Sequence, residues 1–547
     1  MNAPLHLPRR SLSTLTLRRA TWPSRVGASL CALALLLPAV SVPAQAQSAE
    51  TAPRQNQLPA LGDAAAEDFS VGTERKLGEQ IMREIRRDPD YLDDPLLLEY
   101  LQSLWQPLVA QSRAMGNIGT DIDERFAWEP FLVRDRSVNA FALPGGYVGV
   151  HLGLMALTAT RDELASVLAH EMSHVTQRHI ARSISNSRKQ SLIGVAALII
   201  GVLAASRARN ADMANAAIAG SQAGTIQGQL NFSRDAEREA DRVGFAVLSA
   251  AGFSPGGMAA MFEKLDQSSR LNDSGGFPYL RSHPLTTERI GEARSRLGTT
   301  TAAAPVSVVE HSLAQARARV LMDTRVDALR RWQALDADRP AGPLADKLAA
   351  ATGSALASTL LRDWARADAA LATANTLLRA APGSEQRAER FVQLLSVQSM
   401  LARGEPQRAI ALLQPYAADG SRPVTLLNAQ AALAATPAGA VPGAALKVRA
   451  EELQTWVAVH PHDADGWVVL GQTWARLNQP LRSLRAEAEA RLSVGDLTGA
   501  VDRLRAAQRT ARNGAGSDFI EASVVDARLR DIEALRRQLT AEERAAQ

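Results

Sequence analysis

The chain has 547 residues, which is too long for one compact core, so at least two folded units are expected. Apolar residues make up 46% and charged residues 22%, an ordinary composition for a globular protein, while scarce aromatics and abundant alanine favour helix packing. The formal net charge is +4, but residues 1–46 contain five arginines and no acidic residue, leaving 56 basic against 57 acidic residues. The overall basicity therefore gives no indication of nucleic-acid binding, and no nucleic acid is expected as a partner.

The N-terminus has the layout of a secretory signal peptide. Its arginines precede the apolar run "VGASLCALALLLPAVSV", and the small residues of "PAQAQS" follow. This pattern predicts that residues 1–46 are a signal peptide cleaved near Ala46, which places the mature protein in the periplasm. The single cysteine, Cys31, lies in this segment, so no disulfide is expected in the mature chain. Residues 47–69, rich in Ala, Gln and Pro, are interpreted as a linker.

Residues 70–300 are predicted to form the first folded domain. Apolar residues at helical spacing run through 70–113, and short β-like runs lie on both sides of the turn at Pro144-Gly145-Gly146. Thr160 and Glu163 fit a capping box in front of the stretch "LASVLAHEMSHVTQRHIAR". That stretch is therefore predicted to be a helix.

The uncharged stretch "SLIGVAALIIGVLAAS", residues 191–206, is slightly too short to span a bilayer. Basic residues bracket it, and a small, polar segment follows. We interpret it as a buried or re-entrant helical hairpin. A spanning helix and an element that touches a membrane or covers a cleft are the alternatives, so peripheral membrane contact is among the expected partners.

The segment "GTTTAAAPVS" indicates a linker, placed at residues 301–310, beyond which the chain has helical periodicity almost throughout. Three stretches, beginning at Trp364, Leu401 and Leu492, resemble one another, and "GWVVLGQTWARLNQP" has the W-x-x-L-G-x-x-W spacing of a tetratricopeptide repeat. Residues 311–547 are therefore predicted to form a tetratricopeptide-like helical repeat domain, with an irregular helical bundle as the alternative.

The motif "HEMSH" places His170 and His174 four residues apart, so both imidazoles project from one face of the predicted helix. Two imidazoles fixed on one turn supply half of a tetrahedral zinc site. Glu171 can then act as the catalytic acid/base, taking a proton from the attacking water and passing it to the leaving amine. His179 lies nearly opposite His170 around a continuous helix, so it is interpreted as a packing or surface residue.

A third ligand has to come from another segment. The stretch "NFSRDAEREADRVGFAVL" is a second helix candidate, with acidic residues at positions 235, 237, 239 and 241. Glu237 and Asp241 share a face, so one can bind zinc while the other orients a ligand histidine through a hydrogen bond. Spacing alone does not separate Glu237 from Glu239, and an ordinary solvated acidic face is the alternative.

The HExxH motif, followed by E-x-x-x-D inside S-R-x-x-E-x-E-A-D, resembles the HtpX and CAAX-prenyl-protease group of gluzincin metallopeptidases. The resemblance implies a mainly α-helical peptidase domain with a small β-sheet and one zinc ion per chain. It also implies a role for each matching residue: His170, His174 and Glu237 as zinc ligands, Glu171 as catalytic acid/base and Asp241 as the carboxylate behind a ligand.

The signal peptide, "EADRVGFAVLSAAGFSPGGM", "RSHPLTTERI" and the helical second half resemble one exported branch of this group. That resemblance implies a zinc endopeptidase acting in quality control and assembly of outer-membrane β-barrel proteins, with a chaperone-like role as well. The implied partners are unfolded or stalled outer-membrane proteins and, through the repeats, the β-barrel assembly machinery. In this branch the histidine that matches His283 can occupy the open position of the zinc and hold the enzyme latent. A cap or packing role for the His-Pro pair is the alternative.

Two further residues are candidates for contact with the substrate. Asn139 and nearby amides can hold the oxyanion of the tetrahedral intermediate, and Arg289 can pair with site carboxylates or polarise the substrate carbonyl. The stretch "NAFALPGGYVGV" can add an extended peptide to a strand edge, with an ordinary hairpin as the alternative. The competing function is a non-proteolytic holdase or scaffold that binds barrel-assembly clients through its repeats while the zinc site stays latent.

Overall fold

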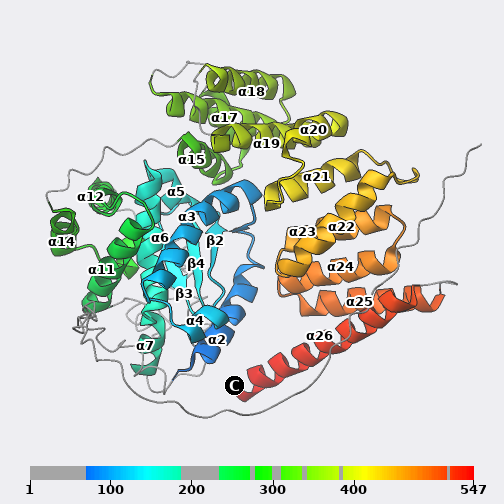
Figure 1. Ribbon diagram of the computed structural model, residues 1–547, viewed down its shortest axis with the longest axis horizontal. Coiled ribbons are helices and arrows are strands. Elements are labelled where there is room, and N and C mark those ends of the chain that lie inside the picture. The colour runs from blue at the N-terminus through cyan, green and yellow to red at the C-terminus, as the bar shows by residue number, and fades with distance from the viewer. Residues whose placement is uncertain are drawn as a thin grey trace, which may run out of the picture. The chain divides into compact units, whose positions relative to one another are not determined.

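The computed structural model describes residues 69–186, 233–271, 277–298, 309–335, 342–380, 386–513 and 518–546 (Figure 1). Most of these residues are helical, and four short strands form one sheet, which confirms the predicted fold class. The predicted signal peptide and the apolar stretch 191–206 lie outside the described residues. Among the residues described, no helix is long and apolar enough to cross a membrane.

The sheet has the order β1-β2-β4-β3, with β2 parallel to β4 and the other pairs antiparallel. The strands are β1 (Tyr91–Leu92), β2 (Glu129–Val133), β3 (Ala140–Leu143) and β4 (Tyr147–His151). The β3–β4 hairpin turns through Gly145 and Gly146, whose φ angles of 78° and 87° favour glycine. This is the turn that the sequence predicts after Leu143.

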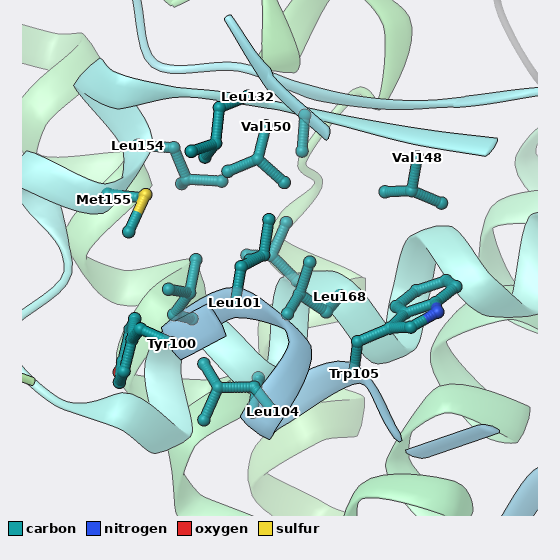
Figure 2. Close-up of a cluster of buried hydrophobic side chains, with 14 of the residues drawn as sticks. Tyr100, Leu101, Leu104, Trp105, Leu132, Val148, Val150, Leu154, Met155 and Leu168 are labelled. Atoms are coloured by element: carbon teal, nitrogen blue, oxygen red, sulfur yellow. The ribbon is translucent and has the colours of Figure 1, made fainter. Parts of the chain in front are cut away.

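Both faces of the sheet are covered, and alternate residues of each strand point to opposite sides. Leu132, Val148 and Val150 pack against α3 (Pro95–Ala114) and α6 (Arg161–Thr176), together with α3 residues such as Leu101 and Trp105 (Figure 2). Phe131, Val133 and Tyr147 face the other way and share a second cluster with apolar residues of α2 (Val71–Ile85). The sheet therefore holds α6 firmly from one side.

Helix α6 begins where the capping box predicts. The Thr160 side chain accepts a hydrogen bond from the Glu163 amide at 3.2 Å, and the Glu163 carboxylate accepts one from the Ala159 amide at 2.7 Å. Every residue of α6 from Asp162 to Thr176 is buried. A helix surrounded in this way presents its polar side chains to protein, so they must find partners there.

The remaining helices of the first half are α4 (Thr120–Arg125), α5 (Leu152–Leu157), α7 (His179–Asn186), α11 (Arg234–Ala250), α12 (Gly256–Leu271), α13 (Tyr279–Ser282) and α14 (Thr287–Leu297). Helices α11 and α12 both pack against α6, and α14 packs against α11 and α12.

From residue 309 the described chain is entirely helical, and successive helices pack against one another. The elements are α15 (Val309–Leu321), α16 (Val326–Ala334), α17 (Leu344–Leu360), α18 (Trp364–Arg379), α19 (Gln386–Ala402), α20 (Pro406–Leu413), η1 (Gln414–Tyr416), α21 (Arg422–Ala434), α22 (Ala444–Val459), α23 (Ala464–Arg476), α24 (Pro480–Ser493), α25 (Leu497–Asn513) and α26 (Phe519–Ala546). Helix α15 joins the first half, because Arg317 makes a buried, two-pronged ion pair with Asp94 at 2.6 and 2.7 Å.

Candidate metal centre

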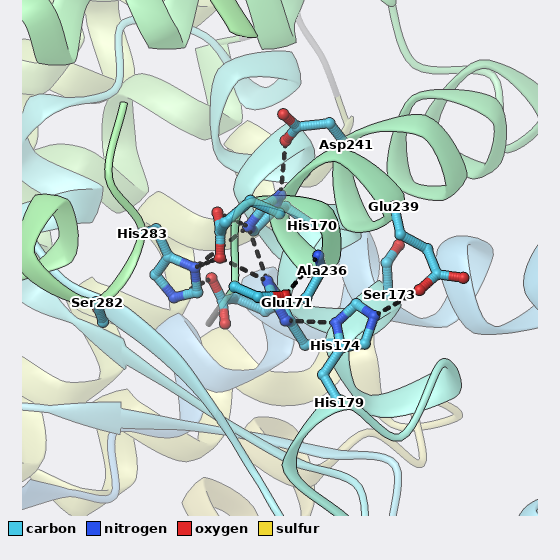
Figure 3. A network of polar contacts seen from close by, with 12 residues as sticks. His170, Glu171, Ser173, His174, His179, Ala236, Glu239, Asp241, Ser282 and His283 are labelled. Carbon is cyan, nitrogen blue, oxygen red and sulfur yellow. Dashed lines mark hydrogen bonds and ion pairs between the residues drawn. The ribbon is translucent and has the colours of Figure 1, made fainter. Parts of the chain in front are cut away.

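Helix α6 carries the first three residues of the site. His170, Glu171 and His174 are each at most 1% exposed. The four-residue spacing brings the Nε2 atoms of His170 and His174 to 3.0 Å from each other, with ring centroids 4.7 Å apart. Glu171 lies beside them on the same turn (Figure 3).

Helix α11 supplies the acidic side of the site because it approaches α6 unusually closely. Gly244 makes this approach possible: a Cβ there would lie 3.1 Å from the Ala169 carbonyl oxygen and 3.2 Å from the His170 nitrogen. The Glu237 carboxylate reaches the Nε2 atoms of His170 and His174, at 3.4 Å in each case. The structure thus brings Glu237, and not Glu239, to His170 and His174. Residue spacing alone could not decide between the two.

His283 is the fourth member of the cluster. It follows the short helix α13, and its ring stacks on Tyr279 with centroids 4.7 Å apart. Its Nδ1 lies 2.9 Å from the Glu237 carboxylate and 3.3 Å from His170 Nε2, while its Nε2 lies 3.4 Å from Glu171. A donor atom from each of His170, His174, Glu237 and His283 falls within 4.8 Å of the others, and all four residues are buried.

The donor atoms fit a zinc ion in both spacing and chemistry. Tetrahedral zinc with bonds of about 2.0–2.1 Å places its ligand atoms about 3.3 Å apart. Five of the six pairs in the cluster, all except His174 with His283, have separations of 2.9 to 3.4 Å when the nearer Glu237 oxygen is taken. In addition, both Glu171 oxygens are buried without a hydrogen-bond partner among the described residues. A buried carboxylate in this state favours a cation nearby.

Asp241 and Arg289 form the layer behind the cluster. Asp241 Oδ1 lies 2.9 Å from His170 Nδ1, the ring nitrogen that faces away from the cluster. Burial alone would lower the pKa of His170, but its hydrogen bonds to Asp241 and Glu237 raise the pKa to about 10. The extra proton on His170 offsets the negative charge of the carboxylates around it. A divalent cation that binds His170 has to displace this proton.

Arg289 is directed at carboxylates. Its guanidinium donates two hydrogen bonds to Asp241 at 2.7 and 2.8 Å, lies 2.8 Å from Glu237 Oε2, and packs over the ring of Phe262. Its charge also helps to keep the pKa of Asp241 below its usual range, although burial acts in the opposite direction. Of the two roles expected for Arg289, these contacts correspond to pairing with site carboxylates.

Asn139 is buried and directly precedes β3. Its backbone carbonyl accepts a hydrogen bond from the His151 amide at 3.0 Å, which extends the β3–β4 pairing by one residue. Its expected contact with an oxyanion stays a prediction.

His179 was expected to be a packing or surface residue and not a zinc ligand. It is buried, at 3% exposed, and is not among the four clustered residues, so the packing alternative holds and the surface one does not. Its position around the helix differs from the expected one, because its Nδ1 lies 2.8 Å from Nδ1 of His174. Helix α6 ends at Thr176, and Arg178 has a left-handed φ of 52°, so a new helix starts at His179. Counting residues around one continuous helix therefore placed His179 on the wrong side. The sequence carries no local sign of this break.

An HExxH helix completed by a glutamate from a second helix defines a metallopeptidase site of the HExxH class. Residues 102–297 match the model of peptidase family M48. Two bacterial relatives cover most of the chain: the beta-barrel assembly-enhancing proteases of Escherichia coli strain K12 and Yersinia pestis are each 30% identical, over 86% and 92% of this chain and 90% and 96% of their own lengths. The chain therefore belongs to peptidase family M48 and, within it, to the beta-barrel assembly-enhancing protease family.

A further relative, the putative beta-barrel assembly-enhancing protease of Vibrio cholerae, is 38% identical over 278 residues. That alignment spans 50% of this chain and 52% of the relative. The family likeness inferred from the sequence motifs is thus confirmed, and the protein is a metalloprotease.

Proposed function

We propose that this protein is a zinc-dependent endopeptidase of the periplasm that acts on unfolded or stalled outer-membrane β-barrel proteins. The observation that carries the proposal is the position of Glu171, a fully buried carboxylate beside the His170, His174 and Glu237 cluster. The expected signal peptide supports export, and the names of the full-length relatives support a role in barrel assembly.

In the proposed reaction His170, His174 and Glu237 hold one zinc ion. When bound, zinc supplies Lewis-acid polarisation and makes a water molecule acidic enough to ionise near neutral pH. Glu171 takes the proton from the attacking water and delivers it to the leaving amine. Asp241 keeps the His170 ring oriented, and Arg289 balances the charges of Glu237 and Asp241.

We further propose that the site is latent in this conformation. His283 Nδ1 has the distances of a fourth ligand, and its Nε2 lies against Glu171, the residue that must face the water. The substrate and its water can then enter only after His283 has moved. We propose that the helices after residue 309 act like tetratricopeptide repeats and bind clients or the assembly machinery. This binding would select which proteins reach the site.

The position of His283 also favours a second candidate function. A zinc ion with four protein ligands is typical of structural sites. In that case the protein acts as a holdase or scaffold through its helical second half, and the zinc site stabilises the fold.

Cleavage assays on matched variants separate the two candidates. With an unfolded outer-membrane protein as the client, Glu171→Gln should abolish cleavage while folding and zinc content are kept. His283→Ala should raise cleavage, and His460→Ala, an exposed histidine far from the motif in sequence, should leave it unchanged. If the parent and His283→Ala proteins both fail to cleave but still prevent client aggregation, the holdase function replaces the endopeptidase.

A further inference from the structure

We propose that His179 and Glu239 are positioning residues that hold the His174 ring in its metal-binding orientation and thereby strengthen zinc binding. The inference rests on the proposed zinc site and extends it to residues outside the HExxH motif and the E-x-x-x-D motif.

The three side chains form a continuous line behind the cluster (Figure 3). Nδ1 of His174 lies 2.8 Å from Nδ1 of His179, and Nε2 of His179 lies 3.0 Å from the Glu239 carboxylate. The same carboxylate oxygen accepts a hydrogen bond from Arg182 at 2.7 Å. The line starts at a proposed ligand and ends at a charged pair near the surface, where Glu239 is 20% exposed.

The direction of the hydrogen bonds follows from the metal site. If zinc takes Nε2 of His174, then Nδ1 of that ring carries the hydrogen and donates it to His179 Nδ1. His179 must then carry its own hydrogen on Nε2, which donates to Glu239. This arrangement gives a partner to Nδ1 of His174 and to both ring nitrogens of His179. It also matches the rule that ligand histidines donate their second ring hydrogen to a fixed acceptor.

The two ligand histidines are therefore supported in different ways. His170 donates directly to Asp241, which comes from the same helix as Glu237. His174 instead contacts the imidazole of His179, the first residue of α7, and His179 in turn contacts the Glu239 carboxylate. Glu239 was the alternative zinc ligand on α11 that spacing alone could not exclude. In the structure it instead pairs with His179, the residue behind His174.

The backbone break that places His179 is held by a contact far away in sequence. Arg178, at φ 52°, donates hydrogen bonds to Glu74 at 2.9 Å and to the Phe69 carbonyl at 2.6 Å, and both Arg178 and Glu74 are buried. A left-handed arginine is unfavourable by itself, so a buried ion pair that fixes its side chain helps to maintain the break. His179 is thereby turned back towards His174.

The test is zinc affinity, measured by competition with a chromophoric chelator, together with the visible spectrum of the cobalt-substituted protein. His179→Phe keeps a ring of similar size without nitrogen atoms, so zinc should bind about ten- to a hundredfold more weakly and the cobalt bands should change. His179→Asn should recover much of the affinity, because its side-chain oxygen can take the place of Nδ1. Glu239→Gln should show a smaller loss, since it still accepts a hydrogen bond.

His311→Phe is the matched control, because His311 is equally buried and hydrogen-bonded but lies outside the metal cluster. It should leave zinc affinity and the cobalt spectrum unchanged. The proposal is overturned if His179→Phe binds zinc like the parent, or if His311→Phe loses as much affinity as His179→Phe. A parent protein that binds no zinc at all would instead overturn the proposed function, so the two failures are distinguishable.

Discussion

Acid should destabilise the junction between α15 and the first half of the chain, and His311 is the titrating group. Its Nε2 donates a hydrogen bond to the Thr158 carbonyl at 3.1 Å, and its Nδ1 lies 2.6 Å from the Tyr100 hydroxyl, which can donate to it only while the ring is neutral. Burial lowers the pKa of His311 from 6.5 to about 4, although the bond to Thr158 acts in the opposite direction.

The sign of the effect follows from proton binding. Below pH 6.5 the unfolded chain takes up a proton at His311, whereas the folded protein does so only near pH 4. The stability that the neutral ring contributes is therefore complete above pH 6.5 and is lost as the pH falls through 6.5 towards 4. Between pH 7.5 and 4.5 this single group should cost about 2.5 kcal/mol of unfolding free energy.

The assay is urea unfolding, followed by tryptophan fluorescence, at several pH values for the parent and for His311→Gln. Glutamine keeps a donor and an acceptor but does not titrate, so the difference between the two proteins isolates this histidine from all other groups. His460→Gln, at an exposed histidine, is the control and should track the parent. A parent–variant difference that stays constant from pH 7.5 to 4.5 would refute the reasoning.

Three further substitutions test how the site is built. Asp241→Asn should weaken zinc binding about ten- to a hundredfold in a chelator competition, and unchanged affinity would exclude its role behind the ligand. Gly244→Val should cost about 1–3 kcal/mol in urea unfolding because its side chain enters α6, whereas Gly291→Ala, with open space around it, should cost nothing. Arg178→Ala should cost about 3–5 kcal/mol because it leaves Glu74 buried without its partner; equal stability of parent and variant would contradict this.

The sequence predicts the parts of the site that depend on local periodicity. His170 and His174 are one helical turn apart whatever surrounds them, and the cap at Thr160 marks where the helix begins. Glu237 and Asp241 share a face for the same reason. Periodicity alone does not separate Glu237 from Glu239. The family resemblance selected Glu237, and in the structure the close approach of α11 to α6 at Gly244 brings Glu237 to the histidines.

The parts that sequence could not provide depend on contacts between distant segments. His179 was misplaced because Arg178, held by Glu74 more than a hundred residues earlier, interrupts the helix. The apolar stretch 191–206 lies outside the described residues, so its interpretation as a hairpin stays a prediction. The division near residue 300 is a prediction as well, and the pairing of Arg317 with Asp94 ties the helices on its two sides together.

The proposed zinc site is tested most directly by the metal content of the purified mature protein. Elemental analysis after dialysis should find one zinc ion per chain in the parent and in Glu171→Gln, and close to none in His174→Phe, which removes a ligand while keeping the ring volume. If the parent contains no zinc after purification without chelators and binds none when it is added, the four clustered residues are not a zinc site. Equal zinc in the parent and in His174→Phe would contradict the assignment of this ligand.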